Sequence, residues 1–564
     1  MKYHIKGKGP VDLTQKDFIA QGGEGSIYAR AQTAFKVYID PQRMIPVSKI
    51  QELAALTHTH IIKPEEILLD AKNNPVGYTM QFVKDTYALC QLFTKAFRSR
   101  NNITPAMMLD LVRKLQDIVK HCHDNKILIV DLNELNFISS NDFKDIYAID
   151  VDSYQTPHFP ATAIMDSIRD RHNKTFSEGT DWFSFAVTAF QMFVGIHPYK
   201  GKHPTVKSID DRMMKNISAF NKDVSLPGAC YPFTVIPDAY KHWFKAVLDD
   251  GKRVAPPGDL NAVINLVQTI KKIVGSDNFD IQDMESLPNT IIEALYHGAL
   301  KVFLTTDGLH INRSFIKDIS SNSKIIFTPK NNSVITATIE RAMLKLFDAT
   351  KQQILTTTVA ATEIMKYDNR LYLKSGSNIL ELQLMELTNN IIPTTKVVGQ
   401  CLERATTFFD GVVVQNMLGS YYVSIFPQAG VHQQIRIKEL DGYKIVDAKY
   451  DHNVLMIVGN VQGKYDKLIF RFDKNETGSY VYDIRIVKDI SIPQINFVVL
   501  DSGVCVHLNS DGEVELFSDK KDSTSLKVIQ DPAITDDMKL MKNGVKLIFS
   551  KDDKLYSMAM KTKS

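Results

Sequence analysis

Residues 129–138, Ile-Val-Asp-Leu-Asn-Glu-Leu-Asn-Phe-Ile, and residues 147–152, Tyr-Ala-Ile-Asp-Val-Asp, carry the most informative pattern in the chain. Apolar residues flank each polar group, which indicates short strands joined by loops. An Asp beside a hydroxyl nucleophile can orient it and accept its proton, and Asn and Asp oxygens can hold Mg²⁺ against nucleotide phosphates. Asp131, Asn136 and Asp150 are therefore candidates for such a site, although any strand–loop–strand could carry this spacing alone.

The composition places few limits on function. The 564 residues predict two to four domains, and 44% hydrophobic and 23% charged residues are ordinary for a globular protein. The net charge of +3 favours no class of partner and gives no sign of nucleic-acid binding. Five scattered cysteines without a Cys-x-x-Cys pair predict reduced thiols and a cytosolic setting. With no visible signal peptide, and no apolar run near the roughly 18 residues of a spanning helix, we expect a soluble, cytoplasmic protein.

A glycine cluster and a strand lysine precede the acidic stretch. Two short apolar segments flank Gly22, Gly23 and Gly25, which predicts a β-hairpin whose backbone N–H groups can donate to phosphates. Lys36 lies eleven residues beyond Gly25 in an alternating strand pattern. Alone, these features also fit a plain hairpin turn and a lysine that points to water. Their order along the chain is what favours a phosphate site.

Two helices and an inner strand complete the first half. Residues 48–57 predict a helix in which Glu52 is the only acid, and residues 76–83 predict a strand. Residues 104–123 place apolar side chains at helical spacing, with Thr104 as the N-cap. This amphipathic helix leads directly into the acidic stretch.

In this order the motifs resemble those of protein kinases. Asp131 and Asn136 match the catalytic loop H-R-D-L-x-x-x-N, Asp150 matches D-F-G, and Lys36 matches V-A-I-K. The glycine cluster resembles G-x-G-x-x-G-x-V, with Ala20 in place of the first glycine. Residues 181–187 resemble the family motif D-x-W-S-x-G-V, and residues 195–201 resemble G-x-x-P-[FY]-x-G. Residues 249–253 resemble D-P-x-x-R. The likeness is strongest to a divergent bacterial and phage kinase-like group with D-L-N-x-x-N and I-D-x-D-S-[YF] motifs.

The resemblance implies a role for each matching residue. Asp131 would orient the hydroxyl or accept its proton, and Asn136 and Asp150 would hold Mg²⁺. The residues that would bind ATP are Gly22, Gly23, Gly25, Ile27 and Lys36 at the phosphates, and Met80, Gln81 and Val83 at the adenine. Glu52 would pair with Lys36. The alternative is that this ion pair is absent, because the usual Glu position falls nearer Lys49.

Several positions depart from the family pattern. Val130 replaces the Arg that receives an activating phosphate, which implies that activity is not switched in that way. Asn133 replaces a phosphate-contacting Lys, and Asp152 replaces the Gly of D-F-G, where it would either add a metal oxygen or bond nearby backbone. Two structural contacts are also implied: Asp181 with the catalytic-loop backbone, and Arg253 with Glu178.

The second half carries a different pattern. After Pro256-Pro257-Gly258, a helix near residues 260–274 and a polar connector, short alternating strands and turns recur. Most of the intervals between them are near 41 residues, and one is near 50. The units lie at residues 332–337, 367–373, 409–414, 450–457, 500–506 and 541–547, with an earlier candidate at 306–311. This period predicts a β-propeller of six or seven blades, with a β-sandwich or an irregular all-β domain as the alternative. We expect this half to bind a protein partner.

Together the patterns predict a two-lobed α+β protein kinase-like domain followed by an all-β domain. The predicted boundaries are an N-lobe at 1–85, a C-lobe at 86–274, a linker at 275–290 and a propeller-like binding domain at 291–564. The leading hypothesis is a Mg-ATP-dependent protein serine/threonine kinase, of the host cytoplasm or the virion if a phage encodes it. The alternatives are a pseudokinase scaffold or structural component that binds nucleotide without phosphorylating, and a kinase-fold enzyme with other nucleotide chemistry such as AMP transfer.

Overall fold

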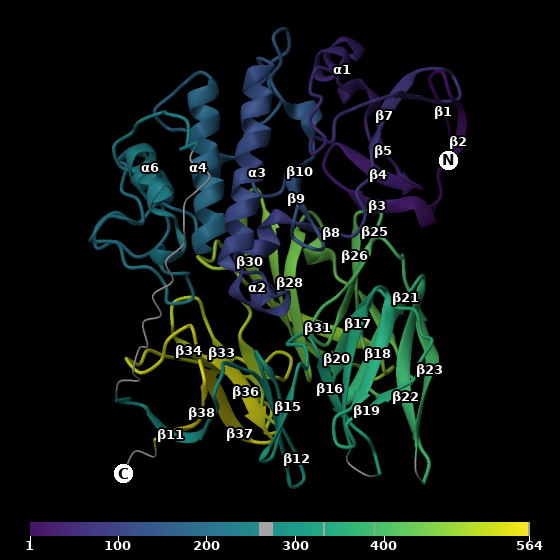
Figure 1. The fold of residues 1–564 in the computed structure, drawn as a ribbon, viewed down its shortest axis with the longest axis vertical. Helices are drawn as coiled ribbons and strands as arrows, with labels where there is room; N and C mark the ends of the chain where they lie inside the picture. The colour runs from purple at the N-terminus through teal and green to yellow at the C-terminus, as the bar shows by residue number, and fades with distance from the viewer. Residues whose placement is uncertain (259–274, 331–332, 389, 562–564) are drawn as a thin grey trace. The chain divides into compact units, whose positions relative to one another are not determined.

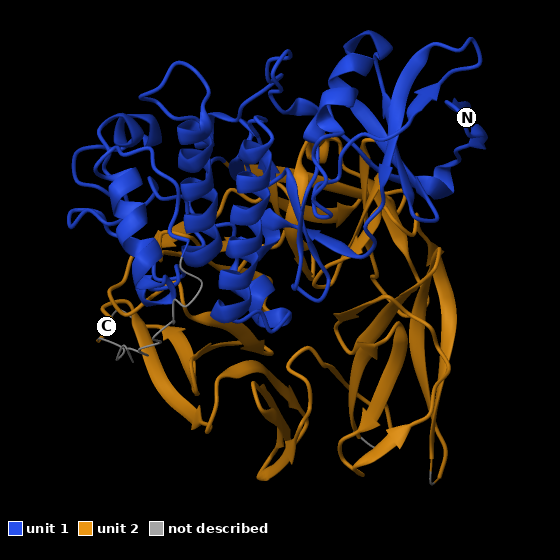
Figure 2. Cartoon of the chain, turned by 45° about the horizontal axis from the view of Figure 1, so that its top comes forward, with its two compact units in different colours: residues 1–270, 460–466, 488–493 blue, residues 271–459, 467–487, 494–564 orange. Residues whose placement is uncertain are grey.

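The computed structural model describes residues 1–258, 275–330, 333–388 and 390–561. The chain forms two compact units (Figure 2): the first comprises residues 1–270, 460–466 and 488–493, and the second comprises residues 271–459, 467–487 and 494–564. The helix predicted near residues 260–274 lies outside the described residues. Of the helices in the described ranges, none is long and apolar enough to cross a membrane.

The first unit begins with a seven-stranded antiparallel sheet (Figure 1). Its strands are β1 (Lys2–Ile5), β2 (Gly9–Asp12), β3 (Phe18–Gln21), β4 (Gly25–Arg30), β5 (Thr33–Tyr38), β6 (Ile67–Leu69) and β7 (Pro75–Gln81), in the order β2-β1-β6-β7-β5-β4-β3. The glycine cluster lies at the turn between β3 and β4, which confirms the predicted hairpin. The lysine strand and the inner strand are also confirmed, as β5 and β7, and they pair with each other.

Helix α1 (Val47–Leu53) follows β5 and ends earlier than the predicted helix over residues 48–57. The end is stabilised from outside the helix, because Lys63 Nζ donates to the carbonyl oxygens of Ala54 at 2.7 Å and Leu56 at 2.5 Å. The carbonyl oxygens of Glu52 and Leu53 accept from the N–H groups of Ala55 and Leu56 at 3.2 and 3.1 Å, and the lysine supplies a donor for two carbonyl groups just beyond the helix. Periodicity alone cannot show where such a distant donor will terminate a helix.

Helices dominate the rest of the first unit. Helices α3 (Pro105–Asp124) and α4 (Glu178–Val194) pack side by side (Figure 1). The unit also contains α2 (Lys95–Arg100), α5 (Ile209–Met214) and α6 (Asp238–Leu248). The predicted cap of α3 is confirmed, since the Thr104 side chain accepts from the Met107 N–H at 3.2 Å. A small sheet, in the order β10-β9-β8, contains β8 (Thr86–Ala88), β9 (Phe137–Ser140) and β10 (Ile146–Ala148). Asp131 and Asn136 therefore precede β9, and Asp150 follows β10.

In its described residues the second unit is all-β and contains seven four-stranded sheets. Six of them use four consecutive strands each, and the seventh joins β11 to β38, β37 and β36. The strands are β11 (Phe279–Ser286), β12 (Ile291–His297), β13 (Leu300–Thr305), β14 (Gly308–Ile311), β15 (Ser314–Lys317), β16 (Lys324–Phe327), β17 (Val334–Glu340), β18 (Met343–Asp348), β19 (Gln353–Leu355), β20 (Glu363–Tyr367), β21 (Arg370–Ser375), β22 (Asn378–Glu386), β23 (Ile391–Gln400), β24 (Thr406–Phe408), β25 (Val413–Met417), β26 (Ser420–Ile425), β27 (Gln433–Arg436), β28 (Lys444–Asp451), β29 (Val454–Val461), β30 (Lys464–Lys474), β31 (Tyr480–Val487), β32 (Phe497–Val499), β33 (Val504–Leu508), β34 (Val514–Ser518), β35 (Leu526–Ile529), β36 (Lys539–Asn543), β37 (Lys546–Lys551) and β38 (Lys554–Met560).

Most of the predicted repeat units fall at equivalent places in these sheets. The last five, from 367–373 to 541–547, each contain the turn into a sheet's second strand, and the unit at 332–337 contains the start of β17. The candidate at 306–311 is wrong by one strand, because it leads into β14, the third strand of its sheet. The equivalent turn is at residues 298–299, where no Asp or Asn marks it.

The stretch predicted as a linker, residues 275–290, contains β11, which pairs with β38. Most of this strand is exposed, and of its side chains only Phe279 is fully buried. Its composition is therefore that of a connector, and only the partner strand makes it part of a sheet.

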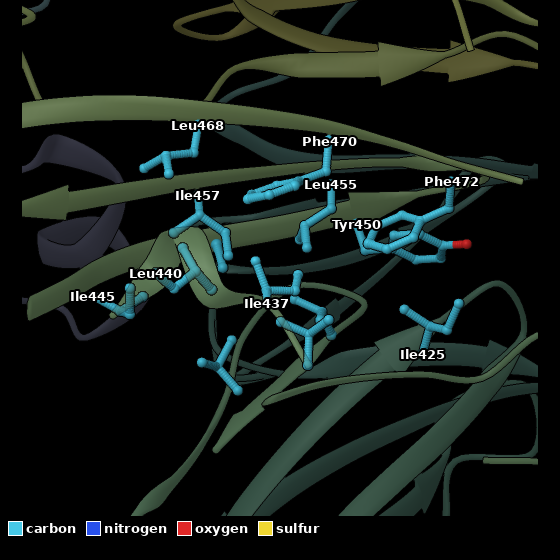
Figure 3. Close-up of a cluster of buried hydrophobic side chains, with 14 residues drawn as sticks. Ile425, Ile437, Leu440, Ile445, Tyr450, Leu455, Ile457, Leu468, Phe470 and Phe472 are labelled. Atoms are coloured by element: carbon cyan, nitrogen blue, oxygen red, sulfur yellow. The ribbon is translucent and has the colours of Figure 1, made fainter. Parts of the chain in front are cut away.

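Neighbouring sheets in the second unit share hydrophobic cores. Figure 3 shows one such cluster, in which Ile425 of the β24–β27 sheet lies near Tyr450, Leu455 and Phe472 of the β28–β31 sheet. Each other consecutive pair of sheets also shares a cluster. The first and last sheets share one as well, built from residues that include Ile291, Phe303, Ile548 and Leu555.

Candidate active site

Lys36 is the centre of a buried cluster of charges in the first unit. Its Nζ lies 2.9 Å from Asp150 Oδ1 and 2.7 Å from Asp152 Oδ2, and Glu24 Oε2 is 3.9 Å away. The lysine side chain is only 7% exposed. The structure thus brings together the predicted lysine and the predicted metal ligand, which are 114 residues apart in the chain.

Lys36 and Asp152 hold each other in the ionised form, whereas burial and the charge of Asp152 raise the pKa of Asp150. Burial alone would lower the pKa of Lys36, but the negative charges of Asp150 and Asp152 raise it well above its usual value. Burial opposes ionisation of Asp152, yet the charge of Lys36 and hydrogen bonds from Lys36, Tyr38 and Tyr78 lower its pKa. Tyr38 donates to Asp152 Oδ2 at 2.5 Å, so burial and the neighbouring carboxylate raise the pKa of this tyrosine.

Asp131 and Asn136, of the predicted catalytic loop, contact each other directly. Asn136 Nδ2 donates to the Asp131 carbonyl oxygen at 2.9 Å and to its Oδ2 at 3.2 Å, and the Met165 N–H donates to Asp131 Oδ1 at 2.8 Å. The Asn136 carbonyl oxygen accepts from the Ile149 N–H at 2.9 Å, which places the loop beside the residue before Asp150. The predicted pair is therefore assembled next to the predicted metal ligand.

Asp181 braces this loop, as predicted. Its carboxylate accepts from the N–H groups of Ile129 at 2.8 Å and Val130 at 2.9 Å, and it contacts His123 Nε2 at 2.9 Å. Val130 has φ of +63° and Asp150 has φ of +58°, a region that costs energy for residues other than glycine. The buried carboxylate therefore stabilises a strained backbone immediately before Asp131.

The predicted Lys36–Glu52 ion pair is absent from the described residues. Glu52 Oε1 lies instead 2.7 Å from His158 Nδ1. The residue of α1 that reaches the site is Lys49, which is fully buried and donates from Nζ to the carbonyl oxygen of Asp152 at 2.8 Å. Lys36 is already neutralised by Asp150 and Asp152, so it does not need an acid from α1.

The predicted Arg253–Glu178 pair is also wrong. Arg253 forms a two-pronged ion pair with Asp170, with Nε–Oδ2 and Nη2–Oδ1 distances of 2.6 Å. Asp170 is almost fully buried, whereas Glu178 is exposed. The segment around Asp170 has no recognisable motif, so the sequence offered no signal for this partner.

The glycines of the hairpin divide into two kinds. A Cβ at Gly22 or Gly23 would meet nothing within 4 Å, whereas a Cβ at Gly25 would lie 2.7 Å from the Val37 carbonyl oxygen. Gly25 is thus required by the packing of β4 against β5. Gly22 and Gly23 have no such requirement, and their exposed backbone could approach a ligand.

The predicted adenine-side and phosphate-side residues share one face of the sheet. Ile27 lies directly opposite Lys36 in the β4–β5 ladder, and Met80 lies opposite Ala34 in the β5–β7 ladder. Opposed residues point to the same face, as do residues two apart in one strand, so Ile27, Lys36 and Met80 are on one side. Gln81 ends β7, and Val83 lies two residues beyond it.

A shallow pocket of about 150 Å³ lies on the other face of this sheet. Thr33 and Phe35, which line it, alternate along β5 with Ala34 and Lys36 and therefore point the opposite way. None of the predicted site residues lines this pocket.

The donor set fits Mg²⁺. Asp150 offers a carboxylate that is 43% exposed. Asn136 donates a hydrogen bond from its amide nitrogen to the Asp131 carboxylate, which directs the amide oxygen of Asn136 away from that carboxylate. Carboxylate and amide oxygens are the ligands Mg²⁺ prefers, usually completed by water and substrate phosphates. Within the described ranges, no group of three or more His, Cys, Asp and Glu side chains is arranged to hold a metal, so phosphates and water would supply the remaining ligands.

Two features of the site were missed by sequence reasoning. Tyr38 is two residues beyond Lys36 in an alternating strand, so its shared face could have been predicted. Glu134 of the catalytic loop could not, because its partners are distant: its buried Oε1 accepts from Asn460 Nδ2 and Tyr465 Oη, each at 3.1 Å. Burial raises the pKa of this glutamate.

Comparisons with known proteins support the fold of this region. No protein-family model matches the chain. Over 204 residues the chain is 22% identical to Tribbles homolog 3 of Mus musculus, a match covering 33% of this chain and 55% of that protein. The chain thus spans about half the length of this curated relative. The distant similarity, with the α+β architecture of the first unit, indicates a kinase-like fold.

Proposed function

We propose that the first unit binds Mg-ATP and transfers the γ-phosphoryl group to serine or threonine hydroxyl groups of proteins. The observation that carries this proposal is the convergence of Lys36, Asp150 and the Asp131–Asn136 pair in one unit. A buried ion pair contributes little to stability compared with an apolar pair of the same size. This favours a functional reason for placing Lys36 against two carboxylates.

Each residue would have a defined role in the transfer. Lys36 Nζ would donate to the α- and β-phosphates, and Gly23 would bring its backbone N–H group to them, since the Gly22 N–H already donates to the Gly25 carbonyl oxygen at 2.9 Å. The substrate hydroxyl oxygen attacks the γ-phosphorus, its proton passes to Asp131, and the bond to the bridging oxygen breaks, so that ADP leaves with that electron pair. Mg²⁺, when bound by Asp150 and Asn136, neutralises charge on the phosphates.

The test compares the purified full chain with two variants under γ-labelled ATP and Mg²⁺. Wild type should transfer label to protein, and Asp131→Ala and Asp150→Ala should not, because the first lacks the proton acceptor and the second lacks a metal ligand. Glu52→Gln is the control, since this carboxylate lies 2.7 Å from His158 Nδ1 and does not pair with Lys36. Undiminished Mg-dependent turnover in Asp150→Ala would refute the metal assignment.

The second candidate function is a nucleotide-binding scaffold without transferase activity. The replacements at Ala20 and Asn133 favour it, because the family uses both positions at the phosphates. The same assay separates the two functions. A scaffold would show no label transfer, while Mg-ATP would still raise the thermal midpoint of the wild-type protein.

For the second unit we propose a closed seven-bladed β-propeller that binds a protein partner. The supporting observations are the pairing of β11 with β38 and the core shared by the first and last sheets. Deleting residues 279–286 should remove this closing strand and lower the thermal stability of the second unit. Unchanged stability after that deletion would contradict closure.

Burial of all five cysteines supports a reducing, cytoplasmic setting.

A further inference from the structure

Asp152 occupies the position that is glycine in the kinase metal-binding motif, and its environment differs sharply from that of Asp150. The Asp152 side chain is 2% exposed, whereas the Asp150 side chain is 43% exposed. Asp152 Oδ2 lies 2.7 Å from Lys36 Nζ and also accepts from the Tyr38 hydroxyl at 2.5 Å. Of the three carboxylates near Lys36, Asp152 is the nearest and the most deeply buried.

These contacts indicate different roles for Asp150 and Asp152. Asp150 is accessible and can turn toward a metal–nucleotide complex. Asp152 cannot leave without abandoning a buried lysine, and an uncompensated buried charge is costly. Lys36 would therefore keep Asp152 as its counter-ion after Asp150 has engaged Mg²⁺.

Helix α1 supplies no competing acid. Glu52 is held by His158, and the residue of α1 that reaches the site is the cation Lys49, on the Asp152 carbonyl oxygen. The helix is therefore attached to the backbone of Asp152 and does not contact Lys36 through a carboxylate. No carboxylate of α1 takes part in the 2.7 Å Lys36–Asp152 contact.

We propose that Asp152 is the positioning residue for Lys36, so that the lysine and its counter-ion are set by β5 and the metal motif without an acid from α1. This inference rests on the proposed nucleotide-binding function and specifies how that site is assembled. It predicts that Lys36 keeps its counter-ion when the carboxylate of Glu52 in α1 is removed.

The first test measures nucleotide affinity by calorimetry on the full chain. Asp152→Asn keeps the shape and removes the charge, and we expect it to weaken Mg-ATP binding about tenfold, the value of one charge-assisted hydrogen bond. Adenosine, which has no phosphates, should bind with unchanged affinity. The matched control Glu52→Gln should bind Mg-ATP as wild type does. Wild-type affinity in Asp152→Asn, or an equal loss in the control, would overturn the proposal.

The second test does not depend on nucleotide. Thermal unfolding is measured for Lys36→Met, Asp152→Asn and the double variant. Lys36→Met removes the cation beside the buried Asp152, and Asp152→Asn leaves Lys36 with Asp150 and the more distant Glu24. If Lys36 and Asp152 are coupled, the double variant should lose less stability than the sum of the single losses. Additive losses would show that the pair is not coupled and would overturn the assignment. If coupling is found but wild type does not bind Mg-ATP, the proposed function fails while the positioning of Lys36 by Asp152 stands.

Discussion

Replacement of Asp181 by Asn tests how strongly the catalytic loop depends on one buried carboxylate. Asp181 is fully buried, and its Oδ2 accepts from the Ile129 N–H and contacts His123 Nε2, while its Oδ1 accepts from the Val130 N–H. An amide has one oxygen and one NH₂ group. In either orientation the NH₂ group faces a backbone N–H, which then loses its acceptor.

The expected cost follows from these contacts. A hydrogen bond to a charged group contributes about 1.5–3 kcal/mol, and an unsatisfied buried donor costs about 1–3 kcal/mol. We therefore expect Asp181→Asn to lower the free energy of unfolding of the first unit by about 3 kcal/mol. For a unit of this size, that corresponds to a fall of about 5 °C in the thermal midpoint.

Tryptophan fluorescence is a suitable assay, because the chain has two tryptophans, Trp182 and Trp243, and both lie in the first unit. The control is Glu178→Gln, an exposed position on the same helix, which should change stability by less than about 0.5 kcal/mol. A loss below about 1 kcal/mol in Asp181→Asn, or a loss equal to that of the control, would refute the reasoning.

Three further predictions concern other contacts. Gly25→Ala should lower thermal stability, because its Cβ would lie 2.7 Å from a carbonyl oxygen of β5, whereas Gly22→Ala should not; equal midpoints in the two variants would contradict this. Asp170→Asn should cost about 2–4 kcal/mol by removing the charge opposite Arg253, measured by the same fluorescence transition, and a neutral result would show that the ion pair does not stabilise the fold. Glu134 has a raised pKa in the folded state, so its contribution to stability is present below its unfolded value, about 4.3, and is lost as pH rises toward the folded value. Glu134→Gln should therefore raise the midpoint relative to wild type at pH 8 but not at pH 4, and a pH-independent difference would contradict this assignment.

Local chemistry explains the parts of the fold that the sequence could predict. Thr104 caps α3, glycines form the β3–β4 turn, and alternating residues build β5, because each of these depends on neighbours in the chain. The bracing contact of Asp181 was predicted from family resemblance and is confirmed at hydrogen-bond distance.

The failures concern partners distant in sequence. Lys36 has Asp152 as its nearest acid where Glu52 was expected, and Arg253 has Asp170 where Glu178 was expected. In each case the sequence contains several acidic residues that could pair with the cation, and only the tertiary packing determines which of them does. Residues 279–286 were predicted as linker for the same reason, since pairing with β38 and not composition makes them a strand.

The most direct test of the central claim is a paired transfer experiment with α-labelled and γ-labelled ATP. The purified full chain is incubated with Mg²⁺ and each nucleotide, and label on protein is measured beside Asp131→Ala. The account predicts transfer of the γ-label alone, lost in the variant. Transfer of the α-label would mean nucleotidyl transfer, and transfer of neither label, or γ-label transfer that survives in Asp131→Ala, would contradict the proposed phosphotransferase.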